Sequence, residues 1–190
     1  MNKEEILKKM LESGALLEGH FELRSGLHSD RYFQCAHVLR FPQLAEELCR
    51  ALAQKLRDSL GDRIAEGVVA PALGGIIVGH ELAKALGAYS IFTEKEGGKL
   101  ALRRFRITAG DRYVVAEDVI TRGGRVQETI DIVESGGGRV VAVAVLVDRS
   151  GGQARFSCPT FSLLGMDLVT YEPTACPLCA QHVPLTHPGS

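Results

Sequence analysis

The segment that most constrains the fold is Tyr113 to Gly138, with the sequence YVVAEDVITRGGRVQETIDIVESGGG. It begins with an apolar, β-prone run that leads to two adjacent acids, Glu117 and Asp118. A turn rich in glycine and arginine, Thr121 to Arg125, follows, and apolar residues then recur at helical spacing. The segment therefore predicts a strand, a tight turn and the N-terminus of a helix.

The predicted turn has the chemistry of a phosphate-binding loop. Glycines let backbone N–H groups approach a ligand, and a helix start adds unpaired donors and a positive dipole end. Thr121 adds a hydroxyl donor, and Arg122 and Arg125 add charges that can pair with phosphate oxygens. At the strand end, Glu117 and Asp118 can accept hydrogen bonds from a sugar diol or contribute to Mg²⁺ binding through water. Phosphate beside diol indicates a ribose 5-phosphate.

Other segments repeat the alternation of strand and helix. The leucine-rich stretch Pro42–Leu60 predicts a long helix with one buried face, and a short apolar strand is expected over Gly67–Ala70. The turn PALGG then opens a helix over Ile76–Leu86. This turn is a second candidate anion loop, made of Ala72, Leu73 and Gly74. The alternation predicts an α/β fold, with a mostly parallel twisted sheet and helices on both faces.

The N-terminal part of the chain predicts smaller elements. Asn2 is expected to cap a first helix that stops near Gly14. Short strands are expected over Phe21–Arg24 and Tyr32–Leu39, on either side of a polar turn.

Two basic residues outside the loops are candidate ligand contacts. Lys95 lies in the segment EKEGGKLALRRF, which predicts a basic hairpin around its two glycines, although a solvated turn competes with that interpretation. Arg149 follows the apolar strand Val140–Val147, which is expected to be buried on both faces. Open α/β sheets bind ligands at the carboxyl ends of their strands, where Arg149 falls. The competing interpretation is that Arg149 only pairs with an acid such as Asp148.

Composition excludes several classes of protein. The 190 residues suit one domain, and a formal net charge of −1 indicates no nucleic-acid partner. No apolar run is long enough to span a membrane and the N-terminus has mixed charge, so we expect a cytoplasmic protein without a membrane partner. The five cysteines do not form a disulfide framework, and Cys35 and Cys49 are expected to be buried thiols.

The C-terminal cysteines leave a metal site open. Cys176 and Cys179 form a CPLC pair, with Cys158 upstream and His182 and His187 downstream. A zinc site could be assembled from these residues. A single Cys-x-x-Cys pair is a weak signal, and we assign no metal ligands from the sequence.

The central motif resembles the signature for 5-phosphoribosyl 1-diphosphate (PRPP) in type I phosphoribosyltransferases. Hydrophobic residues, two acids, further hydrophobic residues, a threonine and a Gly-Gly pair occur in that order. With LRSGLHSDRYFQ, APALGG, VDRSGG and CPLC as well, nearly the whole chain resembles the orotate phosphoribosyltransferase family. The resemblance implies the type I phosphoribosyltransferase fold in a single domain, 1–190, with a small hood from about residue 1 to 40 and part of the C-terminal tail.

The resemblance also implies an activity and a site. The activity is Mg²⁺-dependent transfer of ribose 5-phosphate from PRPP to N1 of orotate, giving orotidine 5′-monophosphate and diphosphate in de novo pyrimidine biosynthesis. A homodimer with shared active sites is implied too. The implied catalytic residues are Lys95, Glu117 and Asp118. The implied PRPP contacts are Ala72, Leu73, Gly74, Glu117, Asp118, Val119, Ile120, Thr121, Arg122, Gly123, Gly124 and Arg125. The implied orotate contacts are Arg24, Phe33, Thr121 and Arg149.

The chain departs from the family pattern at four of these positions. Arg24 stands where the family has a lysine, and Gly74 stands where many members have one. Arg122 and Arg125 replace a threonine and a serine found in many relatives. Two other functions remain open: a purine or uracil phosphoribosyltransferase, which needs no cationic partner for a base carboxylate, and a non-enzymatic PRPP-sensing regulator.

Overall fold

The computed structural model describes residues 1–23, 25–166 and 169–188. Its helices are Lys3–Glu12 (α1), Ala36–Leu39 (α2), Pro42–Leu60 (α3), Gly74–Leu86 (α4), Gly124–Ser135 (α5) and Pro177–Ala180 (α6), with a 3₁₀ turn at Pro173–Ala175. Its strands are Leu16–Glu22 (β1), His28–Phe33 (β2), Gly67–Pro71 (β3), Tyr89–Glu96 (β4), Lys99–Ala101 (β5), Arg112–Ile120 (β6), Arg139–Asp148 (β7), Thr160–Gly165 (β8) and Thr170–Tyr171 (β9).

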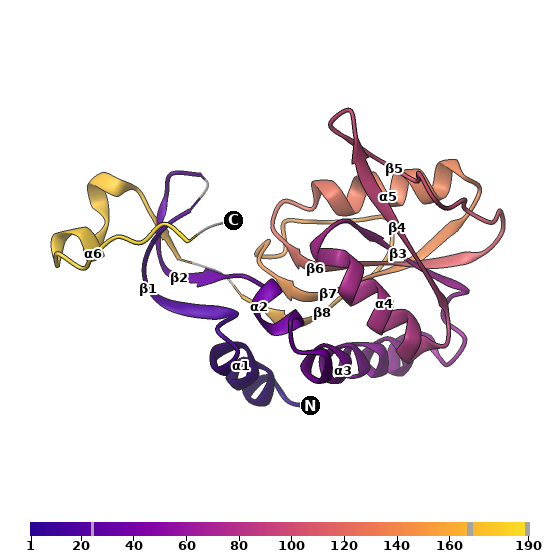
Figure 1. The fold of residues 1–190 in the computed structure, drawn as a ribbon, viewed down its shortest axis with the longest axis horizontal. Coiled ribbons are helices and arrows are strands. Elements are labelled where there is room, and N and C mark those ends of the chain that lie inside the picture. Colours follow the sequence, from indigo (N-terminus) through magenta and orange to yellow (C-terminus); the bar gives the residue numbers. More distant parts are fainter. Residues whose placement is uncertain (24, 167–168, 189–190) are drawn as a thin grey trace.

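A six-stranded sheet forms the larger part of the molecule, with strand order β5-β4-β3-β6-β7-β8 (Figure 1). Strands β4, β3, β6, β7 and β8 run parallel, and only β5 is antiparallel to its neighbour. The expected mostly parallel sheet is thereby confirmed. Parallel strands bring their carboxyl ends to one edge, so the loops that follow β3, β6 and β7 share that edge.

Helices cover both faces of this sheet, as the sequence predicts. Successive residues of a strand point to opposite faces of the sheet, so each central strand contributes side chains to two apolar clusters, one on each face. Val68 packs in the cluster that contains the buried leucines of α3 and α4, whereas the next residue, Val69, packs with the apolar face of α5. Burial on both faces explains why β6 and β7 consist almost entirely of apolar residues until they approach the site edge.

The two helices on one face have the bounds and termini that their sequences favour. Helix α3 begins at Pro42, where a proline costs no intrahelical hydrogen bond, and its leucines Leu48, Leu52 and Leu56 are fully buried. Helix α4 ends before Gly87, which adopts a left-handed conformation with φ of 73°. The predicted helix over Pro42–Leu60 is confirmed in full.

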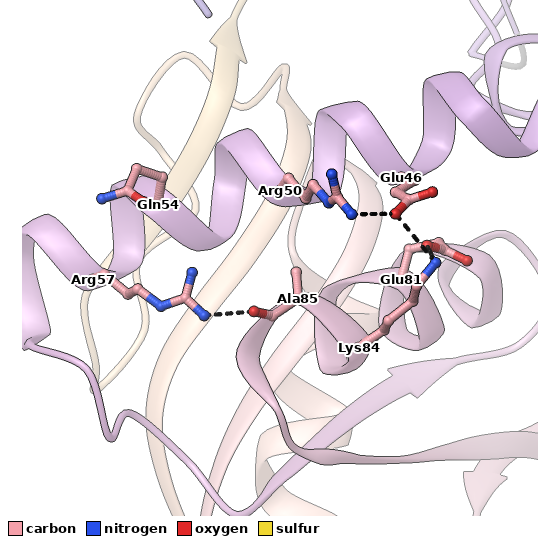
Figure 2. Close-up of a pocket in the computed structure, with 7 residues that line it drawn as sticks. All are labelled: Glu46, Arg50, Gln54, Arg57, Glu81, Lys84 and Ala85. Carbon is pink, nitrogen blue, oxygen red and sulfur yellow. Dashed lines mark hydrogen bonds and ion pairs between the residues drawn. The ribbon is translucent and has the colours of Figure 1, made fainter.

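A charged groove lies between α3 and α4 (Figure 2). Arg50 and Lys84 both contact Oε1 of Glu46, with N–O distances of 2.7 and 3.3 Å. Arg57 donates to the backbone carbonyl of Ala85. Since these groups already contact one another, we assign the groove to the packing of the two helices.

A second, three-stranded sheet with the order β1-β2-β9 lies beside the larger one (Figure 1). Its antiparallel strands join the N-terminal part of the chain to the C-terminal tail. Phe21 also bridges to Thr186, close to the end of the described residues. The tail therefore packs on the β1–β2 hairpin and contributes to the same small unit.

The N-terminal strands were placed incorrectly from the sequence. Strand β1 begins at Leu16, before the predicted start, and β2 begins at His28, inside the segment expected to be a turn. The predicted strand Tyr32–Leu39 is wrong after Phe33, because residues 36–39 form α2. Cys35, Val38 and Leu39 are buried at intervals of three and four residues, which is a helical spacing hidden within a short apolar run.

The first helix is capped as predicted. Two reciprocal hydrogen bonds form a capping box at this terminus. Oδ1 of Asn2 accepts from the backbone N–H of Glu5, and Oε2 of Glu5 accepts from the backbone N–H of Asn2, each at 2.9 Å. Among the described residues, no helix is both long enough and apolar enough to cross a membrane.

Candidate active site

The candidate site lies at the carboxyl edge of the large sheet, where the loops after β3, β6 and β7 meet. Ile120 pairs with Asp148 at the ends of β6 and β7. The Arg149 N–H donates to the Ile120 carbonyl at 2.8 Å, so Arg149 begins its loop beside the start of the glycine-rich turn. The sheet thus brings Arg149 and Thr121, which are 28 positions apart, to one edge.

The turn after β6 has the conformation that its glycines permit. Gly123 precedes α5 with φ of 78°, and a Cβ at this position would lie 2.9 Å from the ring of Phe156. Because glycine has no capping side chain, the first N–H groups of α5 remain available to an anion. Thr121, Arg122 and Arg125 are exposed around them. This arrangement suits a phosphate group.

The loop after β3 packs directly against the two acids of β6. A Cβ built on Gly74 would lie 2.6 Å from Oδ2 of Asp118, and one built on Gly75 would lie 2.9 Å from Oε1 of Glu117. The Ala72 N–H donates to the carbonyl of Thr93 at 2.8 Å, which ties the loop to β4. Glycines are therefore needed here so that α4 can begin beside the carboxylates, and the two candidate anion loops flank one acid pair.

The acid pair has unusual electrostatics. Glu117 is buried, and burial, followed by the neighbouring charge of Asp118, raises its pKa to about 9. The positive charge of Arg125 acts in the opposite direction. At neutral pH the ligand-free protein therefore favours the protonated form of Glu117. A cation bound nearby would favour ionisation of Glu117.

Arg149 is placed to bind an anion. Burial lowers the pKa of its guanidinium, and its Nε is buried without a hydrogen-bond partner among the described residues. Asp148, the acid that could have neutralised it, instead accepts the Ser150 N–H at 2.8 Å. Within the described part of the chain, Arg149 forms no ion pair. A half-buried cation whose buried Nε has no hydrogen-bond partner among the described residues is a strong candidate for a ligand contact.

Residues of the small sheet approach this position. The Cys35 thiol donates to the Asp118 carbonyl at 3.5 Å, and its pKa is raised by burial and by the two acids. The phenol of Tyr32, which is partly exposed, lies close enough to Arg149 to act on its pKa. The region around Arg149 is therefore bounded by both sheets.

The predicted base contacts differ in their placement. Thr121 and Arg149 share the site edge. The Phe33 side chain is only 5% exposed and packs in the apolar core, which is the packing role expected of many aromatic residues. Its neighbour Tyr32 is an aromatic residue that lies beside Arg149. Arg24 lies outside the described residues.

The basic segment forms the predicted hairpin. Lys95 pairs with Leu100 across β4 and β5, and its side chain is exposed. Arg103 and Arg104 form ion pairs with acids of β4, with closest N–O distances of 3.4 and 2.8 Å. Among the described residues, Lys95 forms no hydrogen bond or ion pair with the acid pair of β6. The structure thus leaves Lys95 as a free cation on a projecting hairpin (Figure 1).

Comparison with known proteins agrees with this architecture. Residues 41–163 match the family described as the phosphoribosyl transferase domain, so the fold and the paired anion loops define a type I phosphoribosyltransferase. The chain is 49% identical to an orotate phosphoribosyltransferase of Desulforamulus reducens, with 100% of this chain and 98% of the relative covered. It is 52% identical to that of Carboxydothermus hydrogenoformans, with 98% and 97% covered. The chain belongs to the orotate phosphoribosyltransferase family, which confirms the resemblance seen in its sequence.

A solved structure supports the same assignment. The orotate phosphoribosyltransferase of Aeropyrum pernix has a TM-score of 0.69 and 25% sequence identity to this chain. The match covers 85% of this chain and 93% of that one. The expected type I phosphoribosyltransferase fold is confirmed.

Proposed function

We propose that this protein transfers ribose 5-phosphate from PRPP to N1 of orotate, producing orotidine 5′-monophosphate and diphosphate for pyrimidine nucleotide synthesis. Two relatives that share about half of their residues with this chain are named orotate phosphoribosyltransferases. The observation that carries the choice of base is Arg149, a half-buried cation whose Nε is buried and which has no acidic partner among the described residues. Orotate has a carboxylate to offer it, whereas uracil and the purine bases do not.

The loops divide the binding of PRPP between them. Thr121 to Arg125 and the N-terminus of α5 would hold the 5-phosphate, through backbone donors and two exposed guanidinium groups. Ala72, Leu73 and Gly74 would hold the diphosphate. Val119 and Ile120 would contribute through their place at the end of β6, between the acids and the loop. The transfer requires no covalent catalyst, because positioning of the two substrates and stabilisation of the developing charges are sufficient.

The acid pair would serve the ribose and its developing charge. Glu117 and Asp118 lie where their oxygens can bind the ribose diol. Breaking the anomeric C–O bond leaves a sugar with oxocarbenium character, which an ionised carboxylate stabilises. The high pKa of Glu117 makes its charge conditional on the approach of a cation, so the pair would become fully charged only when Mg²⁺ accompanies PRPP into the site.

The same pair fits Mg²⁺ chemically. Mg²⁺ prefers oxygen ligands and usually keeps several waters, using one or two carboxylates together with substrate phosphates. Asp118 and Glu117 would hold it through water. When bound, Mg²⁺ would offset the charge of the departing diphosphate. Lys95 would add a positive charge to the same group.

The exposed position of Lys95 favours a homodimer with shared active sites. Its hairpin projects from the sheet and is not held against the acid pair of its own subunit (Figure 1). We therefore place Lys95 over the active site of the partner subunit. The five free thiols suit the reducing cytoplasm, where we expect the enzyme to act.

The direct test is diphosphate release from PRPP and Mg²⁺, with orotate, uracil, adenine, guanine and hypoxanthine supplied separately. Orotate alone should support turnover. Turnover with a purine or with uracil would keep the PRPP site and overturn the choice of base. Binding of PRPP without turnover on any base would favour a PRPP-sensing regulator.

A further inference from the structure

Four side chains with metal-binding atoms converge in the small sheet, outside the proposed active site. Two come from β1 and β2 and two from the C-terminal tail: His20, His28, Cys176 and Cys179. One ligand atom from each lies within 4.8 Å of the other three. Figure 1 places α6 beyond β1 and β2, on the side away from the large sheet. The proposed transferase reaction uses none of these residues.

The separations suit a tetrahedral metal ion. With metal–sulfur bonds of about 2.3 Å and metal–nitrogen bonds of about 2.05 Å, a tetrahedron sets nitrogen and sulfur about 3.5 Å apart. The observed distances are 3.5 Å from Cys176 Sγ to His20 Nε2, 3.7 Å from Cys179 Sγ to the same nitrogen, and 3.3 Å from Cys179 Sγ to His28 Nδ1. The two imidazole nitrogens lie 2.9 Å apart, against about 3.3 Å in an ideal site. The two remaining separations, from Cys176 Sγ to Cys179 Sγ and from Cys176 Sγ to His28 Nδ1, are no longer than 4.8 Å.

The surroundings orient the ligands. Nδ1 of His20 lies 2.8 Å from the carbonyl of Val183, which can only accept, so the proton resides on Nδ1 and the lone pair of Nε2 faces the cluster. A metal-bound histidine commonly donates its other N–H to a carbonyl in this way. His20, His28 and Cys176 are each no more than 5% exposed. The imidazoles and the thiol lie within hydrogen-bond distance of one another, so their ligand atoms already converge in a site that is closed to solvent.

The geometry points to a structural Zn²⁺ site formed by His20, His28, Cys176 and Cys179. Two thiolates and two imidazoles are the ligand set that Zn²⁺ takes in tetrahedral sites, and four protein ligands leave no open position for catalysis. The ion would fasten the C-terminal tail to the β1–β2 hairpin, and it would add to links that include the short β2–β9 ladder and the Phe21–Thr186 bridge. Cys158, His182 and His187, the sequence neighbours of the CPLC pair, take no part.

The test is the metal content of the full-length protein, purified without a metal-affinity tag or chelator. Elemental analysis should find about one Zn²⁺ per chain, as expected of a closed four-ligand site. Cys176→Ser and Cys179→Ser should lose it, whereas the matched control Cys158→Ser, a cysteine outside the cluster, should keep it. Absence of zinc from reduced wild-type protein even after incubation with Zn²⁺, or its retention in both cluster variants, would overturn the site.

A second measurement uses the wild-type protein, so it does not depend on the folding of the variants. With Zn²⁺ bound, modification of Cys179, the exposed thiol of the pair, should slow at least about tenfold relative to chelator-treated protein, because a metal-bound thiolate is masked. Chelation should also lower the Tm, since Zn²⁺ binds the folded state preferentially. Equal reactivity and equal Tm with and without Zn²⁺ would contradict the proposal, as would isolation of a Cys176–Cys179 disulfide from freshly reduced, Zn²⁺-treated protein.

Discussion

At the scale of single residues, burial gives Glu117 and Arg149 properties that their sequence positions do not specify. The strand-to-turn pattern predicts that an acid and an arginine stand at strand ends. It does not predict that Glu117 would be protonated at neutral pH or that Asp148 would turn to the Ser150 N–H rather than to Arg149. Both properties depend on neighbours that are distant in the chain, so they become visible only in the folded protein.

Glu117 should make the stability of the ligand-free protein depend on pH. Its pKa is about 9 in the folded state against an ordinary value of 4.5, so between these values the folded state binds one more proton than the unfolded state. Stability contributed by this proton is present below the ordinary pKa and is lost as pH rises toward 9. Glu117→Gln should flatten this decline in Tm, and parallel declines in the two proteins would show that Glu117 is already ionised.

At the scale of elements, the start of α4 and the end of β6 form one unit. The sequence predicts that the turn PALGG opens a helix at Ile76, and the helix begins earlier, at Gly74, so that both glycines belong to its first turn. The need for glycine at positions 74 and 75 could not be predicted, because the carboxylates that leave no room for a side chain there, those of Asp118 and Glu117, come from β6. By contrast, the N-terminal strands were misplaced, since their short segments carry too few residues for a periodic pattern to decide between strand and helix.

Gly74→Ala should therefore weaken PRPP binding more than it weakens the fold. The new methyl group would meet Oδ2 of Asp118 at 2.6 Å, so the carboxylate must leave its position. We expect the KM for PRPP to rise about tenfold or more, which corresponds to loss of one charge-assisted contact. Gly165→Ala is the matched control, because a Cβ there meets nothing within 4 Å. Unchanged PRPP kinetics in Gly74→Ala would argue against the role of the acid pair.

At the scale of the whole molecule, contacts between distant parts of the chain decide what the sequence cannot. The large sheet follows from local patterns of strand and helix, and the whole-chain resemblance to the family supplies the rest. The four-residue zinc cluster could not be predicted from the sequence, because His20 and His28 lie more than 150 residues before the cysteines that they contact. Spacing along the chain instead pointed to Cys158, His182 and His187 as partners. A pair of ligands on a hairpin gives no local signal.

The shared active site is the prediction that belongs to the assembly. Lys95→Ala and Asp118→Ala should each lower kcat by about 100-fold or more, as removal of a group that stabilises the transition state does. If Lys95 serves the partner subunit, each mixed dimer from co-expression contains one site free of both changes, and the activity of purified mixed dimers should recover to about half of the wild-type value. Mixed dimers as inactive as their parents would place Lys95 in the site of its own subunit.

The central claim is that a half-buried arginine directly after β7 selects orotate by its carboxylate. The measurement that tests it most directly is the steady-state kinetics of Arg149→Ala, with Arg139→Ala, an exposed arginine at the other end of the same strand, as the control. Loss of a hydrogen-bonded charge contact should lower kcat/KM for orotate by about 10- to 100-fold, with little change in the affinity for PRPP. The control should match the wild type. If Arg149→Ala retained the wild-type kcat/KM for orotate, recognition of the base would have to come from other residues.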